Sequence, residues 1–170
     1  RDLFSDDAMQ HLRDLAADAF ASLDAMGERA EIWLRHFERS AEAFLAYERG
    51  RDANVAARHA EIDGKHTYPN GFTLIGRADR IDELVAGGLE IIDFKTGAVP
   101  RAAEMKAFEA PQLLLEADIA RGGGFAEVPA SGPQALTYIK VGQGPNALEV
   151  TPYLGVGDAS LADATTTASN

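Results

Sequence analysis

The feature that most constrains the fold is a short apolar segment that carries two opposite charges. Residues 89–95 read LEIIDFK, a mostly apolar run with two β-branched isoleucines at its centre, and the run ends at Thr96-Gly97. Such a run is typical of a central strand covered on both faces. Because side chains two apart in a strand share a face, Asp93 and Lys95 point the same way. We therefore expect a buried strand with a carboxylate and an ammonium on one face.

The preceding segment has a similar carboxylate among apolar residues. Residues 72–84 (FTLIGRADRIDEL) form another expected strand, in which Asp79 shares a face with Ile75 and Ile81. A hairpin turning at the glycines after Ala86 can bring Asp79 close to Asp93. Two carboxylates at close range repel each other unless a proton or a cation intervenes. Mg²⁺ meets that need, since it binds few carboxylates together with water and substrate phosphate.

Spacing alone leaves two interpretations open. In one, the carboxylates hold a metal ion, and Lys95 orients or deprotonates a water molecule or neutralises charge in a transition state. In the other, Asp93 and Lys95 form an ordinary ion pair at a strand end. Arg80 and Asp82 lie on the face opposite Asp79, where we expect them to be solvated or salt-bridged.

Hydrophobic periodicity predicts one α/β core, a central sheet flanked by helices, after an N-terminal helical pair. We divide the chain into a helical segment at 1–56, a core at 57–152 and a tail at 153–170 that begins like a helix and stops. Both ends look cut. The expected elements are two helices within 5–50, strands at 58–68, 72–84 and 89–95, a helix at 110–121, and strands at 134–141 and 147–151.

Composition excludes several classes of site. The chain has no cysteine, which removes disulfides, thiol catalysis and cysteine-ligated zinc or iron–sulfur centres, and fits an intracellular protein. No segment approaches the roughly 20 apolar residues of a membrane helix. The net charge of −11 argues against a free-standing nucleic-acid binder. Residues 51–110 are nearly balanced, with eight basic and ten acidic residues, so the excess of acidic residues lies in the flanks. Acidic flanks suggest that other domains or subunits supply the affinity for nucleic acid.

Three blocks in a fixed order resemble a known family. They are Gly76-Arg77-Ala78-Asp79-Arg80-Ile81-Asp82, then Ile91-Ile92-Asp93-Phe94-Lys95-Thr96-Gly97, then Pro111-Gln112-Leu113. They resemble the G-x-x-D-R-I-D, I-D-Y/F-K-T-G and Q-L blocks of the RecB-type branch of the PD-(D/E)xK nucleases. The run 33–138 is similar to the C-terminal nuclease domain of the AddB family. The resemblance implies a restriction-endonuclease-like mixed sheet and a DNA exonuclease of double-strand break repair and recombination.

The resemblance also implies roles for individual residues. Asp79, Asp93 and the Phe94 carbonyl would be metal ligands for Mg²⁺ or Mn²⁺, and Lys95 the catalytic lysine. It implies two further site residues, Glu61 near the metal and Gln112 against the substrate phosphate or the lysine. No iron–sulfur cluster is expected. The implied partners are DNA and an AddA-type helicase-nuclease subunit, in the bacterial cytoplasm at the nucleoid, with no membrane.

Departures from the family pattern leave alternatives open. Glu61 is also interpretable as a surface glutamate of an edge strand, Gln112 as a helix cap, and Arg77 as an ion-pair partner of Glu61 or Asp79 rather than a phosphate contact. Glu116 stands where the family often has a tyrosine. Members of the family usually carry a histidine on an early helix as a further metal ligand, and we expect this histidine to lie upstream of this chain. A catalytically incomplete DNA-binding or scaffold module is therefore the alternative function.

Overall fold

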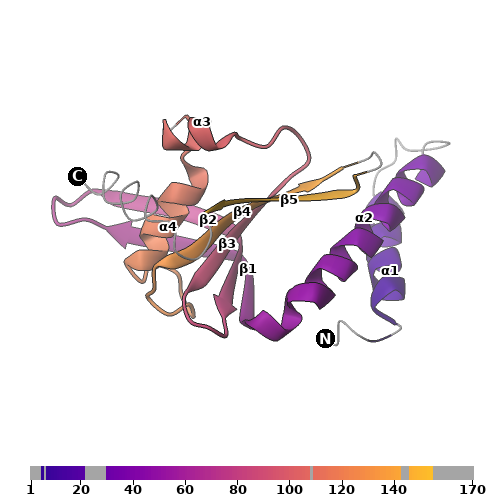
Figure 1. Cartoon of the computed structure of the whole chain (residues 1–170), viewed down its shortest axis with the longest axis horizontal. Helices are drawn as coiled ribbons and strands as arrows, with labels where there is room; N and C mark the ends of the chain where they lie inside the picture. The colour runs from indigo at the N-terminus through magenta and orange to yellow at the C-terminus, as the bar shows by residue number, and fades with distance from the viewer. Residues whose placement is uncertain (1–4, 6, 22–29, 108, 143–145, 155–170) are drawn as a thin grey trace. The chain divides into compact units, whose positions relative to one another are not determined.

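The structure is a computed structural model that describes residues 5, 7–21, 30–107, 109–142 and 146–154 (Figure 1). The chain divides into two compact units. One comprises Arg1–Ala53 and Val141–Glu149, and the other comprises Asn54–Lys140 and Val150–Asn170. Among the described residues, no helix is both long enough and apolar enough to cross a membrane.

The first unit contains the two helices that the sequence predicts within 5–50. They are α1 (Asp7–Ala21) and α2 (Ala30–Arg51), followed by the short 3₁₀ helix η2 (Asp52–Asn54). Arg13 of α1 and Glu38 of α2 form an ion pair with 3.0 Å between Nε and Oε1. Residues 22–29, where the first predicted helix would end, lie outside the described residues.

Three antiparallel strands open the second unit, as the sequence predicts. They are β1 (Val55–Thr67), β2 (Thr73–Leu84) and β3 (Leu89–Lys95), and each pairs with the next. The turn between β2 and β3 contains Gly87 and Gly88, whose φ angles of 90° and 81° suit glycine and strain other residues. The turn chemistry therefore fixes the hairpin that carries the two charged strands.

The remaining strands make the sheet mixed. β4 (Pro133–Val141) pairs with β3 in parallel, and the sheet order is β1-β2-β3-β4-β5, with β5 (Leu148–Leu154) last. β3 is therefore the central strand, and Leu89, Ile91 and Ile92 are fully buried in it. The α/β class with a mixed sheet flanked by helices is confirmed. The predicted tail at 153–170 lies, from residue 155 on, outside the described residues.

Two helices lie in the connection between β3 and β4. The five-residue α3 (Ala102–Lys106) was not predicted, because one turn and a half is too short to show a periodic pattern. The predicted helix at 110–121 is α4 (Gln112–Arg121), which packs across β1, β2 and β3 (Figure 1). Leu113, Leu114 and Ile119 of α4 are fully buried in the core. α4 thereby brings its first turn against the charged end of β3.

Candidate active site

The site begins where β2 and β3 stop pairing as a ladder. Their backbone register runs from Glu83–Leu89 to Arg80–Ile92. Beyond this pair a side chain links the two strands: Asp79 Oδ2 accepts a hydrogen bond from the Phe94 N–H at 2.9 Å. The exchange of a backbone bond for a side-chain bond fixes Asp79 beside the end of β3.

Asp93 and Lys95 share a face, as the strand alternation predicts. Asp93 is 1% exposed, and Lys95 Nζ donates to its Oδ1 at 3.0 Å. Nζ also lies 2.8 Å from Oδ2, but without hydrogen-bond geometry, so Oδ2 has no hydrogen-bond partner among the described residues. Burial raises the pKa of Asp93, Lys95 opposes that rise, and the nearby charge of Asp79 adds to it.

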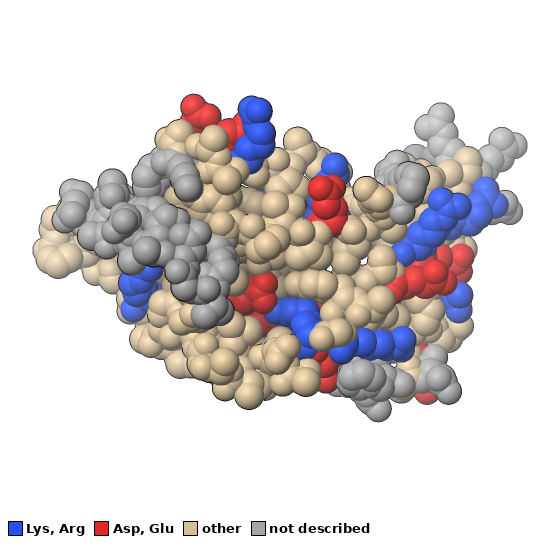
Figure 2. Space-filling model, viewed as in Figure 1, with Lys and Arg blue, Asp and Glu red and all other residues tan. Residues whose placement is uncertain are grey.

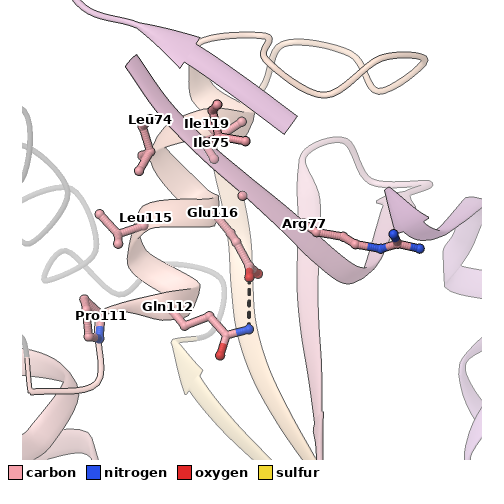
Figure 3. Close-up of a pocket in the computed structure, with 9 residues that line it drawn as sticks. Leu74, Ile75, Arg77, Pro111, Gln112, Leu115, Glu116 and Ile119 are labelled. Carbon is pink, nitrogen blue, oxygen red and sulfur yellow. Dashed lines mark hydrogen bonds between the residues drawn. The ribbon is translucent and has the colours of Figure 1, made fainter. Parts of the chain in front are cut away.

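Gln112, in the first turn of α4, joins the lysine to a second buried carboxylate. Lys95 Nζ donates to Gln112 Oε1 at 3.1 Å, and Gln112 Nε2 donates to Glu116 Oε1 at 3.2 Å (Figure 3). The two α4 residues are four apart, so they stand one above the other on one helix face. The glutamate therefore holds the amide with its oxygen toward the ammonium.

Glu116 is 4% exposed, and its Oε2 has no hydrogen-bond partner among the described residues. Burial raises its pKa to about 7, with a smaller rise from the charges of Asp93 and Asp79, while the bond from Gln112 and the charge of Lys95 lower it. Sequence reasoning noted Glu116 only as a departure from the family pattern. Its spacing from Gln112 on a helix next to the lysine was the available signal.

A second residue that sequence reasoning missed lies on β4. Tyr138 pairs in register with Asp93, is 1% exposed, and has its ring centroid 5.7 Å from Lys95 Nζ. An ammonium over an aromatic ring is electrostatically favourable. Burial and the charges of Asp93 and Glu116 raise the pKa of Tyr138 to about 12, so it is neutral at physiological pH.

Glu61 is not joined to this cluster by a hydrogen bond. It occupies a distorted point of β1 with φ of 53°, and its Oε2 accepts from Arg77 Nε at 3.0 Å. Both side chains are more than half exposed. The structure thus contains the Arg77–Glu61 ion pair that the sequence left as an alternative, and brings together Asp79, Asp93, Lys95 and Gln112.

The buried carboxylate oxygens test whether these residues fit a divalent cation. Asp93 Oδ2 contacts only the Lys95 ammonium, at 2.8 Å and without hydrogen-bond geometry, and Glu116 Oε2 is buried with no hydrogen-bond partner in the described part of the chain, which is costly for a carboxylate. Hard divalent cations prefer carboxylate and carbonyl oxygens of this kind. Within the described ranges, no three acidic or histidine side chains already stand close enough together to hold a metal. The donor chemistry fits a cation, with Asp79 and Asp93 as its carboxylates.

Comparison with known proteins identifies the family of this chain. The model of the PD-(D/E)XK nuclease superfamily matches residues 3–166. The chain belongs to this superfamily. The family assignment implies nuclease activity, and PD-(D/E)XK nucleases generally use divalent metals. The expected relation to this superfamily is confirmed.

Similar proteins add little about the activity. An uncharacterized protein of Rickettsia bellii is 28% identical over 98 residues, which are 56% of this PD-(D/E)XK chain and 12% of the relative. Protein RT0391 of Rickettsia typhi, also uncharacterized, is 28% identical over 98 residues, 56% of this chain and 11% of its own. The crystal structure of SSO0001 aligns at 15% identity and a TM-score of 0.38, covering 87% of this chain and 70% of the other.

Proposed function

We propose that this chain is a Mg²⁺- or Mn²⁺-dependent deoxyribonuclease that hydrolyses phosphodiester bonds from DNA ends. The observation that carries the proposal is the placement of Lys95. Its ammonium contacts both oxygens of Asp93, at 3.0 and 2.8 Å, and Gln112, and it lies one residue from the buried Glu116 carboxylate, whose Oε2 lacks a hydrogen-bond partner among the described residues. A purely structural ion pair gains nothing from a neighbouring carboxylate left in this state.

Each residue has a defined task in this proposal. Asp79, Asp93 and the Phe94 carbonyl would hold the cation, which lowers the pKa of a bound water and offsets phosphate charge. Lys95 carries three N–H donors, and the bonds to Asp93 and Gln112 account for two of them. The third would donate to the attacking water or to a phosphate oxygen on which charge develops.

The cellular context belongs to the same proposal. The three sequence blocks favour an AddB-like subunit of the RecB-type branch, working with an AddA-type partner on double-strand breaks in the bacterial cytoplasm. The net charge of −11 supports a domain that relies on other parts for DNA affinity. The curated relatives, of whose length the match covers 11–12%, support a larger protein around such a domain.

Substitution of the acidic and basic residues tests the activity directly. Asp79→Ala, Asp93→Ala and Lys95→Ala in the intact protein should each lower cleavage of linear DNA with Mg²⁺ by about 10²–10⁴-fold. The matched control is Asp63→Ala, because the Asp63 carboxylate lies on the neighbouring strand and its side chain is 82% exposed. Unchanged cleavage by the three variants would overturn the assignment.

A scaffold that binds DNA without cutting is the second candidate. It is favoured by the lack, within the described ranges, of a cluster that already has metal-binding geometry. Calorimetric titration with Mn²⁺ separates the two functions. Binding that Asp93→Ala abolishes supports the nuclease, whereas no binding by the intact protein supports the scaffold.

A further inference from the structure

A pocket of about 400 Å³ opens between β2 and α4 (Figure 3). Its walls are the aliphatic side chains of Leu74, Ile75, Leu115 and Ile119. The approach of α4 to β2 depends on Gly76, where a Cβ atom would lie 3.1 Å from Ile119 Cδ1. The volume lies within the range of roughly 300–1,000 Å³ that is usual for small-molecule sites.

The polar part of the pocket is shared with the candidate active site. Gln112 and Glu116 line it, and Gln112 is the residue that accepts from Lys95. Gln112 is exposed, and its Oε1 keeps a second lone pair for a bound group, whereas Glu116 Oε2 is buried. A group bound in this pocket would therefore lie next to whatever Lys95 contacts.

The charge of the lining does not favour a phosphate as the occupant. The basic residue in the lining is Arg77, and its guanidinium extends away from the other labelled residues in Figure 3 and pairs with Glu61. The buried carboxyl of Glu116 repels an anion whenever it is ionised. A flat, uncharged group with an apolar face and hydrogen-bond donors on its edge fits the walls and the exposed Gln112 amide oxygen.

A nucleobase has this chemistry. Its faces stack against apolar or planar side chains, and its edge carries amino or imino donors. We propose that the pocket binds an unpaired nucleobase of the strand being cut, adjacent to the phosphate at Lys95. The proposal rests on the nuclease function proposed above and names a part of its substrate.

An unpaired base is required for a geometric reason. A base inside a duplex is covered on both faces by its neighbours and engaged along its edge, so it enters a protein pocket only after unstacking. The pocket therefore predicts that the domain acts on single-stranded or frayed DNA in preference to an intact duplex. A helicase that separates the strands would supply such a substrate.

Single-stranded oligonucleotides that carry one abasic residue, moved along the sequence, test the pocket. With the intact protein and Mg²⁺, one abasic position should slow cleavage of the bond beside it by about fivefold or more, the lower end of what a stacked base contributes. Ile75→Ser should slow cleavage of the complete oligonucleotide by a similar factor and lose the dependence on that position. Ile75 is 73% exposed, so the change leaves the core intact.

Val85→Ser is the matched control, because Val85 is a β-branched residue just after β2, is 65% exposed, and is absent from the pocket lining. It should keep both the rate and the position dependence. Two outcomes would contradict base binding in the pocket but not the nuclease activity. One is equal cleavage of all abasic oligonucleotides by the unaltered protein, and the other is position dependence retained in Ile75→Ser. A protein that cleaves no oligonucleotide overturns both.

Discussion

Two pairs of opposite charges, each spaced two residues apart, lie on neighbouring strands and face opposite sides of the sheet. On β2, Arg80 and Asp82 form a closed pair with bonds of 2.7 and 2.8 Å, and their side chains are 8% and 0% exposed. On β3, Lys95 is 29% exposed, and among the described residues only one oxygen of Asp93 accepts a hydrogen bond from it. The same spacing thus produces a sealed pair and an open one.

The difference arises from geometry and from the charges nearby. A guanidinium can donate two parallel bonds to a carboxylate, whereas an ammonium is a point charge whose donors turn to several acceptors. Lys95 shares its donors with Gln112, and Glu116 lies beyond that amide. Figure 2 shows basic and acidic side chains interspersed on the face in view rather than gathered into one basic patch. The difference between the two pairs therefore depends on the donors and acceptors next to each cation.

The largest expected effect is on the sealed pair. Asp82→Ala leaves the Arg80 guanidinium buried without its carboxylate, which should lower the free energy of unfolding by about 3–5 kcal/mol. Urea unfolding measures the loss. Replacing both residues by apolar ones, Arg80→Met with Asp82→Leu, should restore most of it. A loss below about 1 kcal/mol in Asp82→Ala would show that the pair is not the structural element described.

The next effect is the dependence of stability on pH that arises from Glu116, next to the Lys95–Gln112 contact. Burial raises the pKa of Glu116 to about 7 from an ordinary 4.5, so the unfolded chain loses this proton at lower pH than the folded one. The stability gained from the neutral carboxyl is full below pH 4.5 and is lost as pH rises through about 7. Its contribution is at most about 3 kcal/mol.

Urea unfolding of the metal-free protein at pH 5 and pH 8 measures this contribution. Glu116→Gln should reduce the difference between the two pH values, since the amide does not titrate. An identical difference in the wild type and in Glu116→Gln would contradict the assignment.

A smaller effect is expected at Asp93. Asn keeps the shape of the side chain and removes a buried charge whose pKa is raised, so Asp93→Asn should change the metal-free unfolding energy by no more than about 1 kcal/mol. The rise in melting temperature on adding Mn²⁺ should disappear. Thermal unfolding with and without chelator shows both. A loss as large as that of Asp82→Ala would make the Asp93–Lys95 pair structural as well.

The smallest effect sets the scale for an exposed pair. Arg77 and Glu61 lie on β2 and β1, with side chains 57% and 64% exposed. Arg77→Ala and Glu61→Ala should each change the free energy of unfolding by less than about 0.5 kcal/mol, because solvent screens such pairs. Urea unfolding measures both. A change in the free energy of unfolding above about 1 kcal/mol would mean that side-chain exposure does not predict how much each of these ion pairs contributes to stability.

The strands and the common face of Asp93 and Lys95 could be predicted because they follow from local rules. Alternation assigns a face, and the glycine turns between strands mark where each hairpin reverses. The alternation of side chains along a strand does not say how deeply other parts of the chain bury each face of the sheet. The sequence therefore left Arg80 and Asp82 as solvated or salt-bridged, and their burial depends on packing from distant segments.

The rest of the site depends on long-range placement. Tyr138 comes beneath Lys95 only through the parallel register of β4 on β3, which the sequence of neither strand specifies. Glu116 gains its raised pKa only when α4 packs with its first turn over that strand. The residues that resemble a family could be named in advance, whereas those that neighbour them in space could not.

The parallel pairing of β3 with β4 has a consequence for the order of folding. The three antiparallel strands are joined by short turns and make local contacts, whereas the β3–β4 ladder closes only after the 37 residues from 96 to 132 have been looped back. Nonlocal pairings of this kind form slowly, because the loop loses entropy before contacts compensate. Gln112 lies inside that loop and Tyr138 beyond it, so Lys95 receives both partners late. The proposed nuclease activity should therefore arise at the end of folding, after the three antiparallel strands have formed.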